Sequence, residues 1–198
     1  MKKNLIIVAH PDDETIWMGG AILKAPEIEW TILSLCRSSD SDRKPKFLKV
    51  CEYYNAKPII SDLEDTELAP IQIKHLAEKI ISLLPKKEYN FIYTHGENGE
   101  YGHIRHKETH QAVKALIENN ELKCKKFLAF SYLPGENTPP NHPTLKIPIP
   151  NPRADEYMQL NGDNFKKKLM LIKEIYGFGG HSFEVLSCSN FEAFNIKK

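Results

Sequence analysis

The chain has 198 residues, with 27 basic and 26 acidic side chains and a formal net charge of +1. This length suits a single well-buried domain, and the balanced charge gives no indication of a nucleic-acid or anionic-membrane partner. Lys2 and Lys3 precede only a short apolar run, so no signal peptide or membrane span is predicted and we expect a cytoplasmic protein. The four cysteines have no C-x-x-C spacing, which favours reduced, buried thiols over a disulfide framework.

The first predicted element is a short apolar strand over residues 5–9, which leads directly into His10-Pro11-Asp12-Asp13-Glu14. Such a run is typical of a strand buried on both faces, and its carboxyl end lies where open α/β sheets bind ligands. His10 and Asp13 are close enough in sequence to bind one zinc ion, which leaves Asp12 free to act on a water molecule. The simpler interpretation is that Asp12 or Asp13 caps the following helix.

Strands and helices then alternate along the chain. The Gly19-Gly20 pair in the first helix predicts close packing of that helix on the sheet. Helices are predicted over residues 14–24, 45–55, 70–84, 106–118 and 165–176. Further strands are predicted over residues 30–36, 57–60, 89–94 and 126–131, with a closing segment over 189–194. The alternation implies right-handed crossovers and a largely parallel sheet. Residues 134–152 hold seven of the thirteen prolines and predict an extended excursion, either a flap or an edge strand.

A second polar cluster follows the strand at 89–94 and reads Gly99-Glu100-Tyr101-Gly102-His103-Ile104-Arg105-His106. Its glycines permit a tight backbone path beside a ligand. His103 and His106 lie three residues apart at the start of a helix, so both can face the crevice that holds His10 and Asp13. A His-x-x-His pair alone seldom has a function. Opposite the first cluster it predicts a metal site with two histidines and one aspartate, which leaves positions open for water and substrate.

The two clusters resemble the two motifs of the LmbE/PIG-L family of zinc-dependent sugar-amide deacetylases. The resemblance implies a Rossmann-like, three-layer α/β/α fold with a mostly parallel sheet, in one domain that spans residues 1–198. It also implies that His10, Asp13 and His106 bind one zinc ion per chain, or another divalent transition metal in its place.

The same resemblance implies catalytic roles. Asp12 would be the general base, while Tyr101 and a protonated His103 would stabilise the oxyanion of the tetrahedral intermediate. The sequence departs from the family motif at Ile104-Arg105, where Pro-Asp is usual. If the usual aspartate orients the neighbouring histidine, that partner is missing here. The positive charge of Arg105 also predicts a lower pKa for His103.

Three residues are predicted to bind the substrate. Arg43 resembles a family arginine that reaches sugar hydroxyls or a phosphate, although a solvated surface arginine is an equally good interpretation. Asp65 resembles a substrate-binding acid of the family. His181 follows a glycine-rich loop and is expected to enter the substrate pocket. His95 and His110 are interpreted as ordinary hydrogen-bonding residues, and no phosphate-binding glycine loop indicates a nucleotide.

These residues favour a hydrolase that removes an acyl group, most simply acetyl, from the amide nitrogen of a small-molecule amino sugar. The alternative is a non-catalytic sugar- or metal-binding member of the same fold. Asp12 distinguishes the two, because a structural metal site needs ligands but no spare base. A metal phosphoesterase would favour more carboxylates and a second ion site. The sequence leaves the oligomeric state open, a homo-oligomer included.

Overall fold

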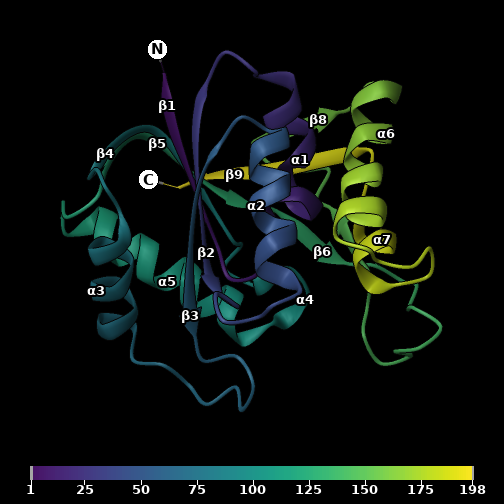
Figure 1. Cartoon of the computed structure of the whole chain (residues 1–198), viewed down its shortest axis with the longest axis horizontal. Helices are drawn as coiled ribbons and strands as arrows, with labels where there is room; N and C mark the ends of the chain where they lie inside the picture. Colours follow the sequence, from purple (N-terminus) through teal and green to yellow (C-terminus); the bar gives the residue numbers. More distant parts are fainter. Residues whose placement is uncertain (1, 198) are drawn as a thin grey trace.

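A seven-stranded sheet runs through the centre of the computed structural model, which describes residues 2–197 (Figure 1). Its strand order is β3-β2-β1-β4-β5-β9-β8. The first five of these strands are parallel to one another, whereas β9 and β8 join one edge in antiparallel pairs. The strands are β1 Lys3–Val8, β2 Glu29–Cys36, β3 Lys57–Leu63, β4 Glu88–Thr94, β5 Lys123–Phe130, β8 Glu156–Gln159 and β9 Phe191–Lys197. The predicted, mostly parallel α/β sheet is confirmed.

Helices cover both faces of this sheet. Figure 1 shows α3 (Ile73–Leu83) and α5 (Ile104–Glu118) on one side, and α1 (Asp13–Lys24), α2 (Arg43–Tyr53) and α6 (Gly162–Met170) on the other. The shorter helical elements are α4 Gly99–Gly102, the π-helix η1 Leu171–Ile175 and α7 Phe183–Ser187. The three-layer arrangement is therefore as predicted. None of the helices within residues 2–197 is long and apolar enough to cross a membrane.

The central strand β1 divides the apolar core in two. Ile6 and Val8 face the core formed with α1 and α2, whereas Leu5 and Ile7 face the core formed with α3 and α5, and all four are fully buried. Burying each such side chain stabilises the fold by about 1.5–3 kcal/mol. Since β1 lies between β2 and β4, the point where the strand order reverses falls at its carboxyl end. This is the position where open α/β sheets bind ligands.

Several element boundaries differ from those predicted. Helix α2 begins two residues before Pro45, because the Asp40 carboxylate accepts hydrogen bonds from the backbone N–H groups of Asp42 and Arg43. Pro70 lies outside α3. Strand β8 and helix α7 were not predicted, and the helix predicted over 165–176 consists of α6 continued by a π-helix. The Pro-rich segment is an extended excursion as expected, but it closes a separate pair, β6 (Tyr132–Pro134) with β7 (Pro148–Pro150), and not an edge of the main sheet.

The glycine pair of α1 permits close packing, and the side chains that come closest lie directly after α2 and after the sheet strand β8. A Cβ atom on Gly20 would lie 2.2 Å from Leu160 Cδ2, and one on Gly19 would lie 2.8 Å from the hydroxyl of Tyr54. The helix also kinks at Met18, whose φ and ψ are not helical. The glycines therefore let α1 approach Tyr54 and Leu160 closely.

Candidate active site

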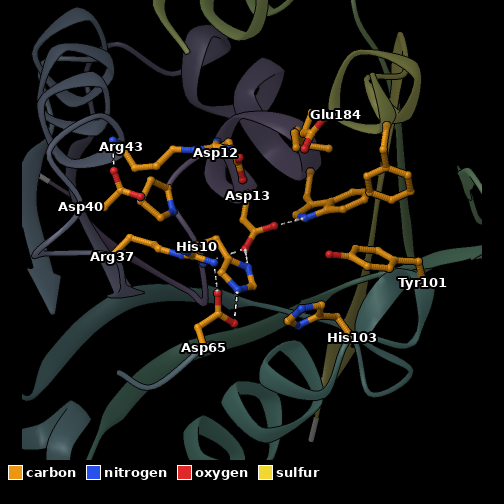
Figure 2. Close-up of a pocket in the computed structure, with 14 residues that line it drawn as sticks. His10, Asp12, Asp13, Arg37, Asp40, Arg43, Asp65, Tyr101, His103 and Glu184 are labelled. Carbon is orange, nitrogen blue, oxygen red and sulfur yellow. Dashed lines mark hydrogen bonds and ion pairs between the residues drawn. The ribbon is translucent and has the colours of Figure 1, made fainter. Parts of the chain in front are cut away.

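A cavity of about 360 Å³ opens at the carboxyl ends of the parallel strands (Figure 2). The β1–α1 turn and the segment after β4 supply opposite walls, and the segments after β2 and β3 supply Arg37 and Asp65. The predicted site residues that line it are His10, Asp12, Asp13, Arg43, Asp65, Tyr101 and His103. His106 is fully buried directly behind this surface. The topology thus brings together side chains that are about 90 residues apart in sequence.

Neither aspartate of the β1–α1 turn caps α1 through its side chain. Asp12 occupies the N-cap position, but its side chain makes no capping hydrogen bond. Its φ of 114° is an unusual backbone conformation for a non-glycine residue, and Glu14 Oε2 holds it by accepting a hydrogen bond from the Asp12 N–H. Asp13 accepts hydrogen bonds from the backbone N–H of His10 and from Trp17 Nε1. The capping interpretation of these carboxylates is therefore not supported.

Three electron-rich atoms converge at the base of the cavity. His10 Nδ1 lies 3.2 Å from both Asp13 Oδ2 and His106 Nε2, and the latter two atoms are 3.4 Å apart. A tetrahedral zinc ion with bonds of about 2.0–2.1 Å separates its ligand atoms by about 3.3–3.4 Å. These atoms therefore have the spacing that a single zinc ion requires. His103 also has a ring nitrogen within 4.8 Å of those of His10 and His106.

Carboxylates on the outer side of His10 and His106 determine which ring nitrogen of each carries the proton. His10 Nε2 donates to Asp65 Oδ1 at 3.0 Å, and His106 Nδ1 donates to Glu100 Oε2 at 2.5 Å. The inner nitrogens of both rings consequently present lone pairs to each other and to Asp13. A cation between them relieves this repulsion, and such carboxylate–histidine pairs are typical of metal centres. The chemistry of the donor set, as well as its spacing, fits a divalent transition metal.

Glu100 was not assigned a role from the sequence. It is buried, and its Oε2 accepts from both His106 Nδ1 and His95 Nδ1, while Oε1 accepts from the Gly96 N–H. Burial opposes its ionisation, but His95 and His106 outweigh this effect and lower the pKa of Glu100 to about 2. Glu100 is therefore the carboxylate partner of His106, whereas His103, whose partner the departure at Ile104-Arg105 had put in doubt, bonds to no carboxylate. His95 Nε2 accepts the Ala9 N–H, which makes His95 a hydrogen-bonding residue as expected.

Asp12 faces the cavity as a basic carboxylate. Burial, reinforced by the negative charge of Asp13, raises the pKa of Asp12 well above its ordinary range. Arg43 NH1 donates to Asp12 Oδ2 at 2.8 Å, and the same guanidinium stacks 4.4 Å above the Phe178 ring. Arg43 is thus an ordered member of the site and not a freely solvated surface arginine.

Tyr101 and His103 form the opposite wall and point toward His10 (Figure 2). His103 Nδ1 accepts the Arg105 N–H at 3.3 Å, so its remaining proton is on Nε2. Burial lowers the pKa of His103 to about 3, and the neighbouring His106 and His10 add to this shift. His103 is therefore a neutral hydrogen-bond donor, whereas the sequence predicted a protonated one. The guanidinium of Arg105, which the sequence predicted to lower this pKa, pairs with Glu64 and Glu108.

Two of the predicted substrate-binding residues lie elsewhere or are already engaged. The Asp65 side chain is buried, and its two oxygens bind His10 and the Arg37 guanidinium. Both oxygens of Asp65 are therefore engaged beside the candidate metal centre, although the residue lines the cavity and its binding to a substrate stays a prediction. His181 does not line this cavity but a second one of about 610 Å³, beside the Pro-rich segment. The short helix α7 explains the difference: Phe183 and Glu184 face the first cavity, while His181 lies on the side of the second.

Fold and site together define an α/β protein with a candidate His/Asp metal centre at the carboxyl ends of its parallel strands. Residues 5–117 match the family model of PIG-L, GlcNAc-PI de-N-acetylase, and the chain belongs to this family. A curated relative is the uncharacterized protein L374 of Acanthamoeba polyphaga mimivirus, with 28% identity over 120 residues. The matched region covers 52% of this chain and 52% of that relative, so the similarity spans about half the length of each.

Solved structures share the fold at low sequence identity. N,N'-diacetylchitobiose deacetylase from Pyrococcus horikoshii has a TM-score of 0.71 and 15% identity, with 99% of this chain and 84% of that chain covered. GalB, a 4-carboxy-2-hydroxymuconate hydratase from Pseudomonas putida KT2440, has a TM-score of 0.60 and 18% identity, with coverages of 94% and 83%. The zinc-inhibited form of teicoplanin deacetylase Orf2 has a TM-score of 0.65 and 10% identity, with coverages of 89% and 84%.

Proposed function

We propose that this protein is a metal-dependent hydrolase that removes an acetyl group from the amide nitrogen of a small-molecule amino sugar. The observation that carries the proposal is the convergence of His10 Nδ1, Asp13 Oδ2 and His106 Nε2 at a cavity that the Asp12 carboxylate also lines. Membership of the PIG-L family supports the acyl-amide substrate. The deacetylases of the same fold are consistent with it, although a fold shared with a hydratase does not by itself decide the reaction.

In the proposed reaction His10, Asp13 and His106 hold zinc or another divalent transition metal, which when bound polarises the acyl oxygen and acidifies water. Asp12 accepts the proton of the attacking water, a role that its raised pKa suits. Tyr101 Oη and His103 Nε2 donate hydrogen bonds to the acyl oxygen as negative charge develops on it. Asp12, now protonated, returns the proton to the leaving amine. Arg43 orients Asp12 and contacts the substrate at its other edge.

A non-catalytic metal-binding role is not favoured. Such a role needs the three ligands but gives no reason for a buried carboxylate with a raised pKa at their side. It also gives no reason for the polar wall of Tyr101 and His103 across the cavity.

The test is acetate release from a panel of N-acetyl amino sugars, measured after metal removal and reloading. Zinc, cobalt and manganese should be titrated separately, since zinc inhibits one deacetylase of this fold. We expect one ion per chain and metal-dependent acetate release. Loss of bound metal in His106→Ala would agree with the ligand assignment, and stoichiometric metal in that variant would remove His106 from the coordination sphere.

Asp12→Asn separates catalysis from metal binding. Asparagine tolerates the positive φ of this position better than most residues and is nearly isosteric, but it cannot accept the proton. The variant should keep its metal and lose about 10²–10⁴-fold in turnover, the usual contribution of a general base. A near-normal rate would assign the base elsewhere.

A further inference from the structure

Arg105 of α5 is fully buried, although arginine is seldom buried unless it is paired. Its guanidinium makes three hydrogen bonds. Nε donates to the backbone carbonyl of Glu64 at 2.6 Å, NH2 donates to Glu64 Oε2 at 2.5 Å, and NH1 donates to Glu108 Oε2 at 2.6 Å. Arg105 therefore joins α5 to the loop between β3 and α3, which begins after Leu63.

The same network holds the other end of that loop. Glu108 is paired with Arg105, and its second oxygen accepts a hydrogen bond from the Ile71 N–H at 2.8 Å. Glu64 also shapes the turn that follows it, because its Oε1 accepts the N–H groups of Thr66 and Glu67. The backbone of the loop between β3 and α3 is thus held at its start by Arg105 and at its end by Glu108, which lie on adjacent turns of α5.

This network ends at the metal centre through Asp65, the residue directly after Glu64. Asp65 Oδ1 accepts a hydrogen bond from His10 Nε2 at 3.0 Å, and Oδ2 accepts one from Arg37 at 2.6 Å. We propose that Arg105 is a positioning residue for the metal centre: it fixes Glu64 and thereby holds Asp65 against His10. The proposal rests on the metal site of the proposed function. It adds to that site a residue whose side chain contacts neither the metal-binding residues nor the substrate.

The chemistry explains why an arginine occupies this position. Its planar guanidinium can bind a backbone carbonyl and two carboxylates at once, whereas the ammonium group of lysine lacks this fixed geometry. The Asp65–His10 hydrogen bond sets the orientation and tautomer of the His10 ring. Loss of such an outer partner typically weakens metal binding by about 10–100-fold. Displacing Glu64 should therefore weaken metal binding from a distance.

The decisive experiment is a double-mutant cycle read out as the zinc dissociation constant, measured by competition with a chelator. Arg105→Met should weaken zinc binding by about tenfold or more, and Asp65→Asn by about 10–100-fold. In the Asp65→Asn background, Arg105→Met should have little further effect, because the two residues act through one contact. Equal losses in both backgrounds, or no loss in wild type, would overturn the proposal.

A second readout needs no metal. In metal-free protein, Arg105→Met should speed hydrogen exchange at the amides of Thr66, Glu67 and Ile71. Leu116→Ala is the matched control, since it opens a cavity on the same helix and leaves the Glu64 contacts intact. It should leave both the exchange of these amides and zinc affinity close to wild type. Unchanged loop exchange in Arg105→Met would also contradict the proposal.

Glu64→Gln is a second variant in case Arg105→Met does not fold. The Glu64 side chain is partly exposed, and the backbone carbonyl of residue 64 still accepts the hydrogen bond from Arg105 Nε in this variant. It should weaken zinc binding in the same direction but by less. Failure of wild type to bind any metal would refute the proposed function, whereas the exchange result would still report on the Arg105 network. The two failures are therefore distinguishable.

Discussion

At the candidate metal centre, carboxylates on the outer side of His10 and His106 determine which ring nitrogen of each carries the proton. Asp65 accepts the outer N–H of His10, and Glu100 accepts that of His106, so both inner nitrogens are available as ligands. His103 differs, because its Nδ1 accepts a backbone N–H and no carboxylate is bonded to its ring. The same residue type thus has two chemical states within one site. The two candidate ligands, His10 and His106, present lone pairs, whereas His103 presents the N–H of a neutral ring.

His103 should therefore contribute mainly to the transition state. Removing one donor to a developing oxyanion costs about 10²–10³-fold in the best-studied case. We expect His103→Ala to lower kcat by a similar factor and to keep its metal, as measured by steady-state kinetics and metal analysis. His103→Gln, which keeps a donor near the position of Nε2, should recover part of the rate. Loss of metal in His103→Ala would instead make His103 a ligand.

The candidate ligands could be predicted from the sequence because they lie within two short motifs that follow strands. Their outer partners could not. Glu100 lies inside the second motif, but it reaches His106 only because its own φ of 56° turns the chain back. Asp65 has the right residue type, yet its contact with His10 depends on how the loop after β3 is anchored by Arg105. A side-chain partner set by tertiary contacts leaves no periodic signal in the sequence.

At the scale of elements, α1 depends on a carboxylate from the far end of the chain. After the kink at Met18, the second half of the helix begins with free N–H groups at Gly20 and Ala21. Glu192 of β9 accepts both at 2.8 Å, and Lys168 of α6 donates to the same carboxylate at 2.7 Å. Both charged residues are fully buried. The pair thus replaces the capping residue that the kinked helix lacks.

Glu192→Gln should destabilise the fold by about 3–5 kcal/mol, because it leaves the Lys168 ammonium buried without a compensating charge. Equilibrium urea unfolding measures this loss. Adding Lys168→Met to the variant removes that charge and should restore part of the stability. If Glu192→Gln were as stable as wild type, the two backbone hydrogen bonds alone would account for the role of Glu192.

The accuracy of the sequence prediction also varied by element. Helices and strands with buried apolar faces, such as β2 and α5, were placed within a few residues, because their periodicity follows directly from burial. The short edge strand β8 reads Glu-Tyr-Met-Gln and has no apolar run to reveal it. Helix α7 has only five residues, which is too short for a helical period to show in the sequence. The elements that were missed are therefore those too short, or too polar, to carry a periodic apolar pattern.

At the scale of the whole molecule, the last third of the chain completes a site whose motifs lie in the first half. Tyr176 Oη donates to Glu14 Oε1 at 2.8 Å, and the Phe178 ring lies under the Arg43 guanidinium. Phe183 packs edge-on against Tyr101 at 4.7 Å between ring centroids. Tyr176, Phe178 and Phe183 lie outside the family match at 5–117. Part of the cavity wall is therefore built by C-terminal residues that lie beyond the family match, such as Phe183 and Glu184.

His110 links the stability of the whole molecule to pH. It is buried, its Nδ1 donates to the backbone carbonyl of His95 at 2.8 Å, and burial lowers its pKa below the ordinary value of 6.5. Below pH 6.5 the unfolded chain therefore binds a proton at this residue that the folded chain does not. Stability contributed by His110 is complete above pH 6.5 and is lost as the pH falls toward the lowered pKa.

His110→Asn should remove this dependence, because the asparagine amide can keep the hydrogen bond of Nδ1 but does not titrate. In urea unfolding of metal-free protein between pH 7.5 and about 5, the stability of wild type should fall relative to that of the variant. Groups elsewhere titrate equally in both proteins, so they cancel in the difference. His142→Asn, at an exposed position in the Pro-rich segment, is the control and should run parallel to wild type. A stability difference between wild type and His110→Asn that stays constant with pH would show that His110 does not couple folding to protonation.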